Sequence, residues 1–107
     1  MAEIQCLKIR IQPGKTQRLV EWLKGLKYRP KDLREAQAAG GILLESLFLE
    51  RTEEADYLVF YTRAENLARL GETFERSTLP LDLETKQIIR ETWGEVTQLE
   101  PIVDLER

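Results

Sequence analysis

The stretch ILLESLFLERTEEADYLVFYT, residues 42–62, decides the fold of this chain. It holds two runs rich in apolar, aromatic and β-branched residues, 42–51 and 57–62, which are typical of strands. The acidic turn 52–56 joins them, and so short a connection predicts an antiparallel hairpin. Because the first run is almost continuously apolar, we expect its strand to be covered on both faces or to meet a partner.

Outward from the hairpin, the spacing of apolar residues changes several times. Alternation over residues 3–11 predicts a strand, and Pro13-Gly14 ends it. A helical period predicts helices over 15–28, 31–39, 64–76 and 83–93, and a last strand follows over 95–99. Without its accessory helices this order is βαββαβ, the split unit of ferredoxin-like folds. We therefore predict a single ferredoxin-like α+β domain over residues 1–107, with helices on one face of a four-stranded antiparallel sheet.

Strand alternation divides the sheet residues between two faces. The face toward the helices is expected to hold Leu7, Ile9, Ile11, Leu44, Phe48, Leu58 and Phe60. The opposite face then receives Cys6, Lys8, Arg10, Leu43, Glu45, Leu47, Leu49, Tyr57, Val59, Tyr61 and Leu99. This second face is too apolar to leave in water as a broad surface. The sequence therefore predicts a homodimer in which two such faces pack together.

Composition excludes several kinds of site. The chain has 107 residues, no histidine and one cysteine. Without histidine it has no His general base, no Ser-His or Cys-His nucleophile pair and no His-ligated zinc or haem. A single cysteine forms neither a disulfide nor a thiolate metal cluster within one chain. We expect no cofactor and no metal site.

The net charge of −3 conceals an uneven distribution. Residues 1–34 carry nine Lys or Arg against three acidic residues, whereas the remaining 73 carry seven against sixteen. Such a split is typical of an anion-binding face, or of complementary surfaces that meet between subunits. No apolar run approaches the roughly 18 residues that cross a membrane, and the first residues lack a signal-peptide pattern. We expect a cytoplasmic protein with no membrane partner.

Short motifs give the chain a family resemblance. Pro13-Gly14-Lys15 is similar to the strand-to-helix joint of the dimeric α+β barrel superfamily, and residues 45–50 with 56–61 resemble the central hairpin of one family within it. That family consists of small bacterial proteins of unknown function. The resemblance implies a homodimer whose two sheets enclose a barrel-like cavity. Superfamily relatives include cofactor-independent monooxygenases, haem-degrading enzymes and ligand-binding proteins, but the haem-binding relatives use a histidine that this chain lacks.

Glu45 is the most interesting candidate for a site, because it is a lone carboxylate within an apolar strand. Lys8 and Arg10 share its expected face, as do Tyr57 and Tyr61. One interpretation makes Glu45 a ligand-anchoring or proton-transferring group in a cavity lined by these residues. The other makes it half of a structural ion pair, across strands or between subunits.

Three further features allow two interpretations each. The basic stretch 24–34 with Tyr28 suits phosphate contacts, yet a solvated connection between helices explains its charges too. Tyr57 and Tyr61 resemble the stacking aromatics of RNA-recognition modules. Glu53, Glu54 and Asp56 in the acidic turn suit a divalent cation, but their spacing lacks a calcium-loop pattern. A solvated turn explains these charges too. Cys6 has no paired base in sequence, and we interpret it as an inert thiol.

These observations favour a homodimeric protein that binds a small ligand in the cavity between its sheets. The alternative is a cofactor-independent monooxygenase or isomerase acting on an aromatic or polyketide-like substrate, with Glu45, Tyr57, Tyr61 and Arg10 as its polar residues. A third hypothesis is an RNA-binding module, although the acidic balance argues against nucleic acid as a partner. The sequence does not require enzyme activity.

Overall fold

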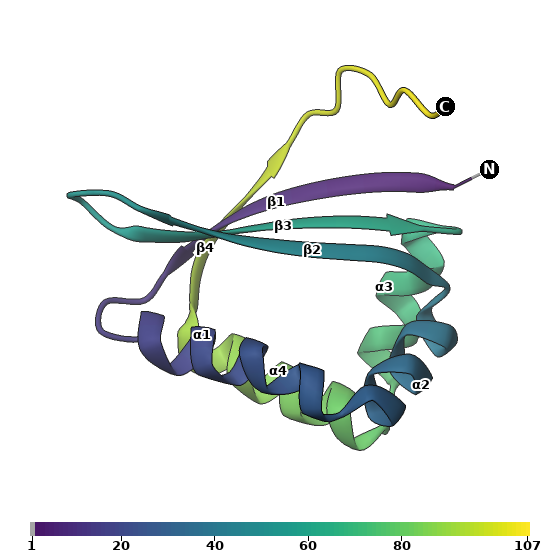
Figure 1. Cartoon of the computed structure of the whole chain (residues 1–107), viewed down its shortest axis with the longest axis horizontal. Helices are drawn as coiled ribbons and strands as arrows, with labels where there is room; N and C mark the ends of the chain where they lie inside the picture. Colours follow the sequence, from purple (N-terminus) through teal and green to yellow (C-terminus); the bar gives the residue numbers. More distant parts are fainter. Residues whose placement is uncertain (1) are drawn as a thin grey trace.

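A computed structural model describes residues 2–107 as a four-stranded antiparallel sheet covered by helices on one face (Figure 1). The elements are β1 (Glu3–Ile11), α1 (Thr16–Gly25), the 3₁₀ turn η1 (Leu26–Tyr28), α2 (Pro30–Gly40), β2 (Ile42–Arg51), β3 (Asp56–Ala64), α3 (Leu67–Arg76), α4 (Pro80–Thr92) and β4 (Trp93–Leu99). The strand order is β2-β3-β1-β4. The predicted ferredoxin-like α+β fold is confirmed.

Local sequence signals explain where the helices begin and end. Pro30 and Pro80 each occupy the first turn of a helix, where a missing N–H costs no hydrogen bond. The main chain N–H of Arg69 donates to the Asn66 side chain at 2.8 Å, which caps α3. Helix α2 ends where Gly41 adopts φ 68°, a conformation that favours glycine. Because Pro80 occupies its first turn, helix α4 begins three residues before the predicted start at residue 83.

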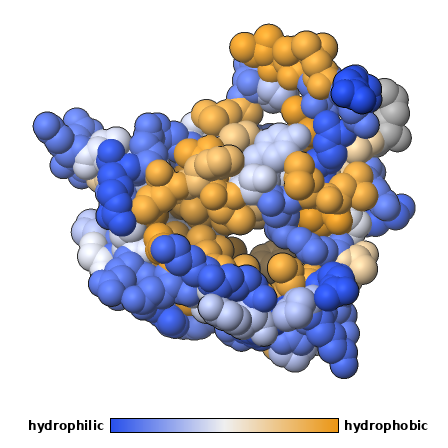
Figure 2. Space-filling view, viewed as in Figure 1, coloured by the Kyte–Doolittle hydropathy of each residue, from blue (hydrophilic) through white to orange (hydrophobic). Residues whose placement is uncertain are grey.

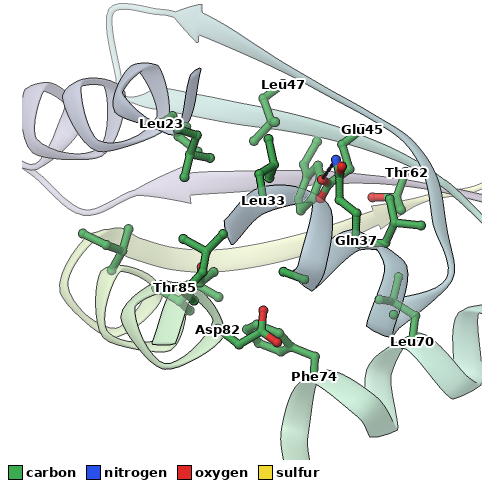
Figure 3. A pocket seen from close by; sticks show the side chains of 18 of the residues that line it. Leu23, Leu33, Gln37, Glu45, Leu47, Thr62, Leu70, Phe74, Asp82 and Thr85 are labelled. Atoms are coloured by element: carbon green, nitrogen blue, oxygen red, sulfur yellow. Dashed lines mark hydrogen bonds between the residues drawn. The ribbon is translucent and has the colours of Figure 1, made fainter. Parts of the chain in front are cut away.

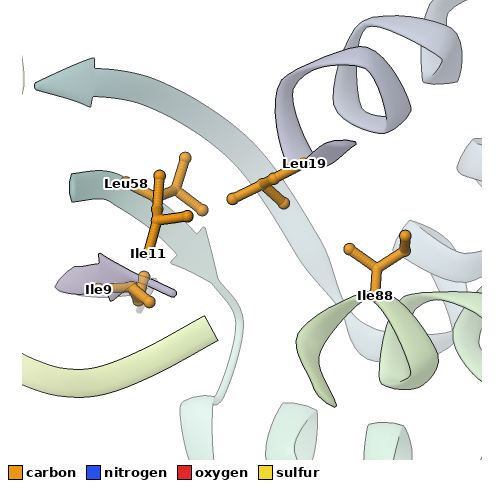
Figure 4. Close-up of a cluster of buried hydrophobic side chains, with 5 residues drawn as sticks. All are labelled: Ile9, Ile11, Leu19, Leu58 and Ile88. Carbon is orange, nitrogen blue, oxygen red and sulfur yellow. The ribbon is translucent and has the colours of Figure 1, made fainter. Parts of the chain in front are cut away.

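The hydrophobic core lies at one end of the space between sheet and helices. It is formed by Ile9, Ile11, Leu19, Leu58 and Ile88, which Figure 4 shows converging from β1, β3, α1 and α4. All five side chains are at most 3% exposed. This cluster anchors α1 and α4 to one end of the sheet, while α2 and α3 lie under the other end of the sheet (Figure 1).

The face assignment predicted for the strand over residues 42–51 is wrong. Ile42 and Glu45 lie three residues apart, yet both face the helices, because the register with β3 shifts between Ile42 and Leu44. The extra residue inverts the alternation along the rest of β2. Leu47, opposite Phe60, therefore faces the helices, whereas Leu44 and Phe48 lie on the outer face. For β1 and β3 the predicted faces agree with the residues that form the core.

The outer face of the sheet carries exposed apolar side chains. Phe48 is 61% exposed and Leu44 is 49% exposed, and both belong to this face. The C-terminal segment, residues 100–107, lies on the same side, away from the helices (Figure 1). Arg63 holds this segment through Asp104 at 2.9 Å and Glu106 at 2.8 Å. Among residues 2–107, no helix has the length and apolar character needed to cross a membrane.

Candidate functional site

A cavity of about 350 Å³ lies between the sheet and the helices of the single chain. Figure 2 shows apolar residues gathered around a hollow between the two layers. Its apolar lining includes Leu19, Trp22, Leu23, Leu26, Leu33, Ile42, Leu47, Leu58, Phe60, Leu70, Phe74, Leu81, Ile88, Ile89 and Trp93. Its polar lining consists of Gln5, Gln37, Glu45, Thr62, Thr73, Asp82 and Thr85. A concave, mostly apolar space with a few converging polar groups is typical of small-molecule sites.

Two glycines shape the wall of the cavity on the side of α2 and α3. A Cβ on Gly40 would lie 2.6 Å from Cδ1 of Leu70, so the close packing there depends on the missing side chain. A Cβ on Gly71 would meet nothing within 4 Å. Gly40 thus lets the Leu70 side chain pack against the backbone of α2, and Gly71 leaves open space beside it.

Glu45 projects from β2 into this cavity (Figure 3). The Nε2 group of Gln37, on α2, donates a hydrogen bond of 2.9 Å to Oε2 of Glu45. This bond uses one carboxylate oxygen and fixes the orientation of the group. The other oxygen, Oε1, has no partner among residues 2–107 and is free to accept from a ligand.

Asp82 is a second carboxylate in the cavity wall. It is the third residue of α4, and Figure 3 shows its side chain on the opposite side of the cavity from Glu45. Only 9% of Asp82 is exposed, and no group of residues 2–107 forms a hydrogen bond or ion pair with its carboxylate. No fully buried side-chain oxygen in the described chain lacks a partner, so the Asp82 oxygens keep accessible surface. The space that they line is the cavity.

Glu84 ties the helices together at the edge of the cavity. It accepts hydrogen bonds of 2.7 Å from Nε1 of Trp22 and from the guanidinium of Arg29. The hydrogen bond from Arg29, followed by that from Trp22, lowers the pKa of Glu84 below its ordinary value. Since Trp22 lines the cavity, Glu84 fixes the orientation of one wall residue.

Two of the basic residues in the first third of the sequence pair with acidic residues of α4 within the chain. Arg29 pairs with Glu84, and Arg18 pairs with Glu91 at 3.3 Å. Both pairs join the basic first third of the sequence to the acidic helix α4. The charge split therefore stabilises the contact between α1, the following turn and α4.

The other predicted site residues lie on the outer face, away from Glu45. Lys8 pairs with Glu50 at 3.0 Å, and its ammonium lies 4.5 Å from the centroid of the Tyr57 ring. Tyr61 lies opposite Cys6 on the same outer face. The expectation that Glu45 shares a face with Lys8 is wrong, because the register shift in β2 turns Glu45 toward the helices.

Arg10 has a different neighbourhood. It lines a small polar hollow of about 260 Å³ together with the turn that follows β1 and the acidic turn 52–56. Thr16 Oγ1 donates to Asp56 there at 2.7 Å. In the part of the chain that the structure describes, no cluster of three or more cysteine or carboxylate side chains is arranged to hold a metal ion.

Sequence reasoning missed Asp82 and Gln37 as members of the site. The predicted helix began at Leu83, which left Asp82 outside it. The order Pro80-Leu81-Asp82 carries the signal of a helix start, proline first and an acid in the first turn. No local signal marks Gln37, since its role depends on the position of β2 above α2.

Several solved structures share this fold. L-rhamnose mutarotase from Formosa agariphila has a TM-score of 0.63 at 13% identity, over 97% of this chain and 99% of that one. SnoaB, a cofactor-independent oxygenase from Streptomyces nogalater, has a TM-score of 0.60 at 11% identity, over 99% of this chain and 98% of that one. A dimeric ferredoxin-like protein of unknown function from Bacteroides fragilis has a TM-score of 0.54 at 13% identity, over 90% of this chain and 91% of that one. At such identities the likeness shows the fold alone.

The sequence itself points to a family. No curated protein matches the chain. The model of a family of unknown function, DUF6176, matches residues 2–107, which is nearly the whole sequence. The chain belongs to this family of unknown function, DUF6176.

Proposed function

We propose that the protein binds a small, largely apolar molecule in the cavity between its sheet and its helices. The observation that carries this proposal is the cavity of about 350 Å³ itself, which is lined mainly by apolar side chains. The volume lies within the range of small-molecule pockets, about 300–1,000 Å³. The site thus differs from the space between two sheets that the sequence suggested, and each chain carries its own.

The Glu45–Gln37 pair supports a binding role. A structural ion pair would use up the Glu45 carboxylate, but its partner is a neutral amide and Oε1 stays available. The pair joins β2 to α2 in the wall of the cavity, where a ligand would contact both layers. Apolar walls then supply affinity, and the oriented carboxylate supplies specificity.

A fluorescence titration with N-phenyl-1-naphthylamine, a neutral apolar probe, tests this proposal. We expect saturable binding of one probe per chain. Ala36→Phe should weaken binding about tenfold, or about 1.4 kcal/mol, because residue 36 lines the cavity. Ala39→Phe is the matched control, since it adds the same ring to an exposed position of α2. Equal binding by both variants would place the probe elsewhere and contradict the proposal.

We also propose that a second copy of the chain covers the outer face of the sheet. Four strands about 4.8 Å apart and about nine residues long span roughly 550 Å² of flat sheet. The side chains that project from this face and the C-terminal segment add to the flat area and bring it toward the roughly 800 Å² per partner of a stable interface. Ile102 is 95% exposed and Leu105 is 87% exposed on that segment, which lies on the same side. The Bacteroides fragilis protein of this fold is described as dimeric.

Sedimentation of matched variants tests the dimer. Phe48→Glu places a charge in the proposed interface and should yield monomers at micromolar concentration. Leu83→Glu is the control, because Leu83 is similarly exposed but belongs to α4 in the helical layer. A wild-type monomer would contradict this proposal. Salt-sensitive binding of single-stranded RNA by that monomer would instead favour the RNA-binding hypothesis for Tyr57 and Tyr61.

Proton transfer by Glu45 is the second candidate function. The neighbours of this fold include an oxygenase that needs no cofactor and a mutarotase. Oε1 of Glu45 faces an apolar space, where a carboxylate is an effective general base. It would remove a proton bound to carbon and return a solvent proton. Tyr57, Tyr61 and Arg10 lie outside the cavity and play no part within one chain.

Isotope exchange tests this second function. Anthrone is an aromatic ketone with acidic carbon-bound protons, and we expect the protein to speed its deuterium uptake from D₂O. Glu45→Gln should remove that acceleration, whereas Glu50→Gln, on the same strand but outside the cavity, should keep it. Exchange at the rate found in buffer alone would contradict a role in proton transfer.

A further inference from the structure

The charge of the cavity wall is entirely negative. Of the residues that line it, only Glu45 and Asp82 have an acidic side chain. No lysine or arginine belongs to the lining. The Lys86 ammonium lies 5.4 Å from the Phe74 ring, but it donates to the main-chain carbonyls of Glu75 and Ser77 and does not line the cavity.

Asp82 has no structural role that accounts for its burial. A carboxylate in the first turn of a helix interacts favourably with the positive end of the helix dipole, but an exposed carboxylate does so as well. Asp32 shows this, since it is the third residue of α2 as Asp82 is of α4, and it is half exposed and paired with Arg29. Asp82 instead is nine-tenths buried, unpartnered and directed into the cavity (Figure 3).

The Asp82 oxygens keep some accessible surface, but in a residue that is nine-tenths buried they are less hydrated than on an open surface and gain no hydrogen bond in return, which is costly. A bound ligand that donates to Asp82 removes this cost. The apolar walls require that the rest of the ligand be hydrophobic. Ligand anions are disfavoured, since two carboxylates and no cation surround the space.

We infer that the cavity selects an amphipathic amine, a molecule with an apolar body and a protonated amino group that Asp82 receives. The inference rests on the proposed function and adds the chemical class of the ligand to it. A hydrogen bond between two charged groups is roughly twice as strong as one between neutral groups. The ammonium is therefore preferred over a hydroxyl of the same length. The apolar body lies toward the Leu33 and Leu47 side of the cavity (Figure 3).

Calorimetric titration with three probes of one shape tests the inference. 4-Phenylbutylamine, 4-phenylbutan-1-ol and 4-phenylbutanoate share an apolar body and differ in the charge of the head group. We expect the amine to bind about tenfold more tightly than the alcohol, and the alcohol more tightly than the carboxylate. Asp82→Asn should lower the affinity for the amine about tenfold and leave that for the alcohol unchanged. Asp32→Asn, the matched helix position outside the cavity, should change neither.

The outcomes separate this inference from the function on which it rests. Equal binding of the three probes would overturn the preference for amines and retain the apolar site. Binding of the amine that Asp82→Asn does not weaken would overturn the role of Asp82. Binding of none, when N-phenyl-1-naphthylamine also fails, would overturn both. Should Asp82→Asn fail to fold, the order of the three probes on the wild-type chain still decides the question.

Discussion

Replacing Asp82 with leucine should make the free protein more stable. Asp82 as a whole residue is 9% exposed, and its carboxylate has no hydrogen-bond or ion-pair partner in residues 2–107. Leaving a buried polar group unpaired costs about 1–3 kcal/mol, which the substitution removes. Loss of the acid from the first turn of α4 costs about 0.3–1 kcal/mol in the opposite direction. Leucine has the same branching as aspartate, with methyl groups in place of the two oxygens, and the cavity has room for them, so we expect a net gain of about 1–2 kcal/mol.

The matched substitution Asp32→Leu should have the opposite sign. Asp32 holds the same position in α2, but it is half exposed and accepts from Arg29 at 3.3 Å. This variant loses the interaction with the helix dipole and relieves no buried charge, so its free energy of unfolding should fall.

Urea unfolding at one protein concentration measures both variants, with Trp22 and Trp93 as intrinsic fluorophores. For a domain of this size, about 1 kcal/mol corresponds to about 4–8 °C in Tm. In thermal unfolding, Asp82→Leu should therefore have a higher Tm than the wild-type chain and Asp32→Leu a lower one. If both variants lose stability, Asp82 acts as an ordinary helix-start residue. The idea that it is held ready for a ligand would then be refuted.

Three other predictions concern the edge of the cavity and the glycines. The hydrogen bond from Arg29 is the main cause of the lowered pKa of Glu84. The Glu84 carboxylate therefore contributes fully to stability above the ordinary glutamate pKa of about 4.3. This contribution is lost as the pH falls through the lower pKa of the folded state. Urea unfolding should show wild type losing more stability than Glu84→Gln between about pH 5 and pH 3, and equal losses would contradict this. Gly94→Ala should lower Tm, because its Cβ would lie 2.8 Å from a main-chain carbonyl oxygen of β1. Gly71→Ala should raise stability by about 1 kcal/mol, since the methyl group meets nothing within 4 Å and alanine favours the helix; a lower Tm would contradict the open space beside residue 71.

Most of the fold could be predicted from local pattern. The strands over residues 3–11 and 42–51 have the bounds that alternation and apolar content predicted. The fold class followed from the order of the elements, because a short acidic turn allows only a hairpin between the two central strands. Helix bounds were less accurate, since α4 begins with Pro80, which the periodicity of apolar residues does not include.

The site could be predicted only in part, and the reason is the register of β2. The sequence marks Glu45 as a lone carboxylate among apolar residues, and in the structure it lines the cavity. One extra residue at Leu43 reversed the faces of the strand that follows. The partners predicted for Glu45 were therefore those of the wrong face, and the cavity was expected between two sheets. A register shift depends on pairing with β3, and pairing leaves no mark in the sequence of β2 alone.

Asp82 could not be identified as a site residue from the sequence for a similar reason. An aspartate after proline at a helix start is common and stabilising. Its burial comes with its place in the cavity wall, which residues of α3 such as Phe74 also line. The chemistry of the cavity thus depends on packing between elements far apart in the chain.

A crystal structure of the protein with bound 4-phenylbutylamine tests the central claim most directly. We predict one amine in each chain, in the cavity between sheet and helices, with its nitrogen within hydrogen-bond distance of an Asp82 oxygen and its ring among the apolar side chains. An empty cavity, with the amine on the outer face of the sheet or between two sheets, would contradict the claim.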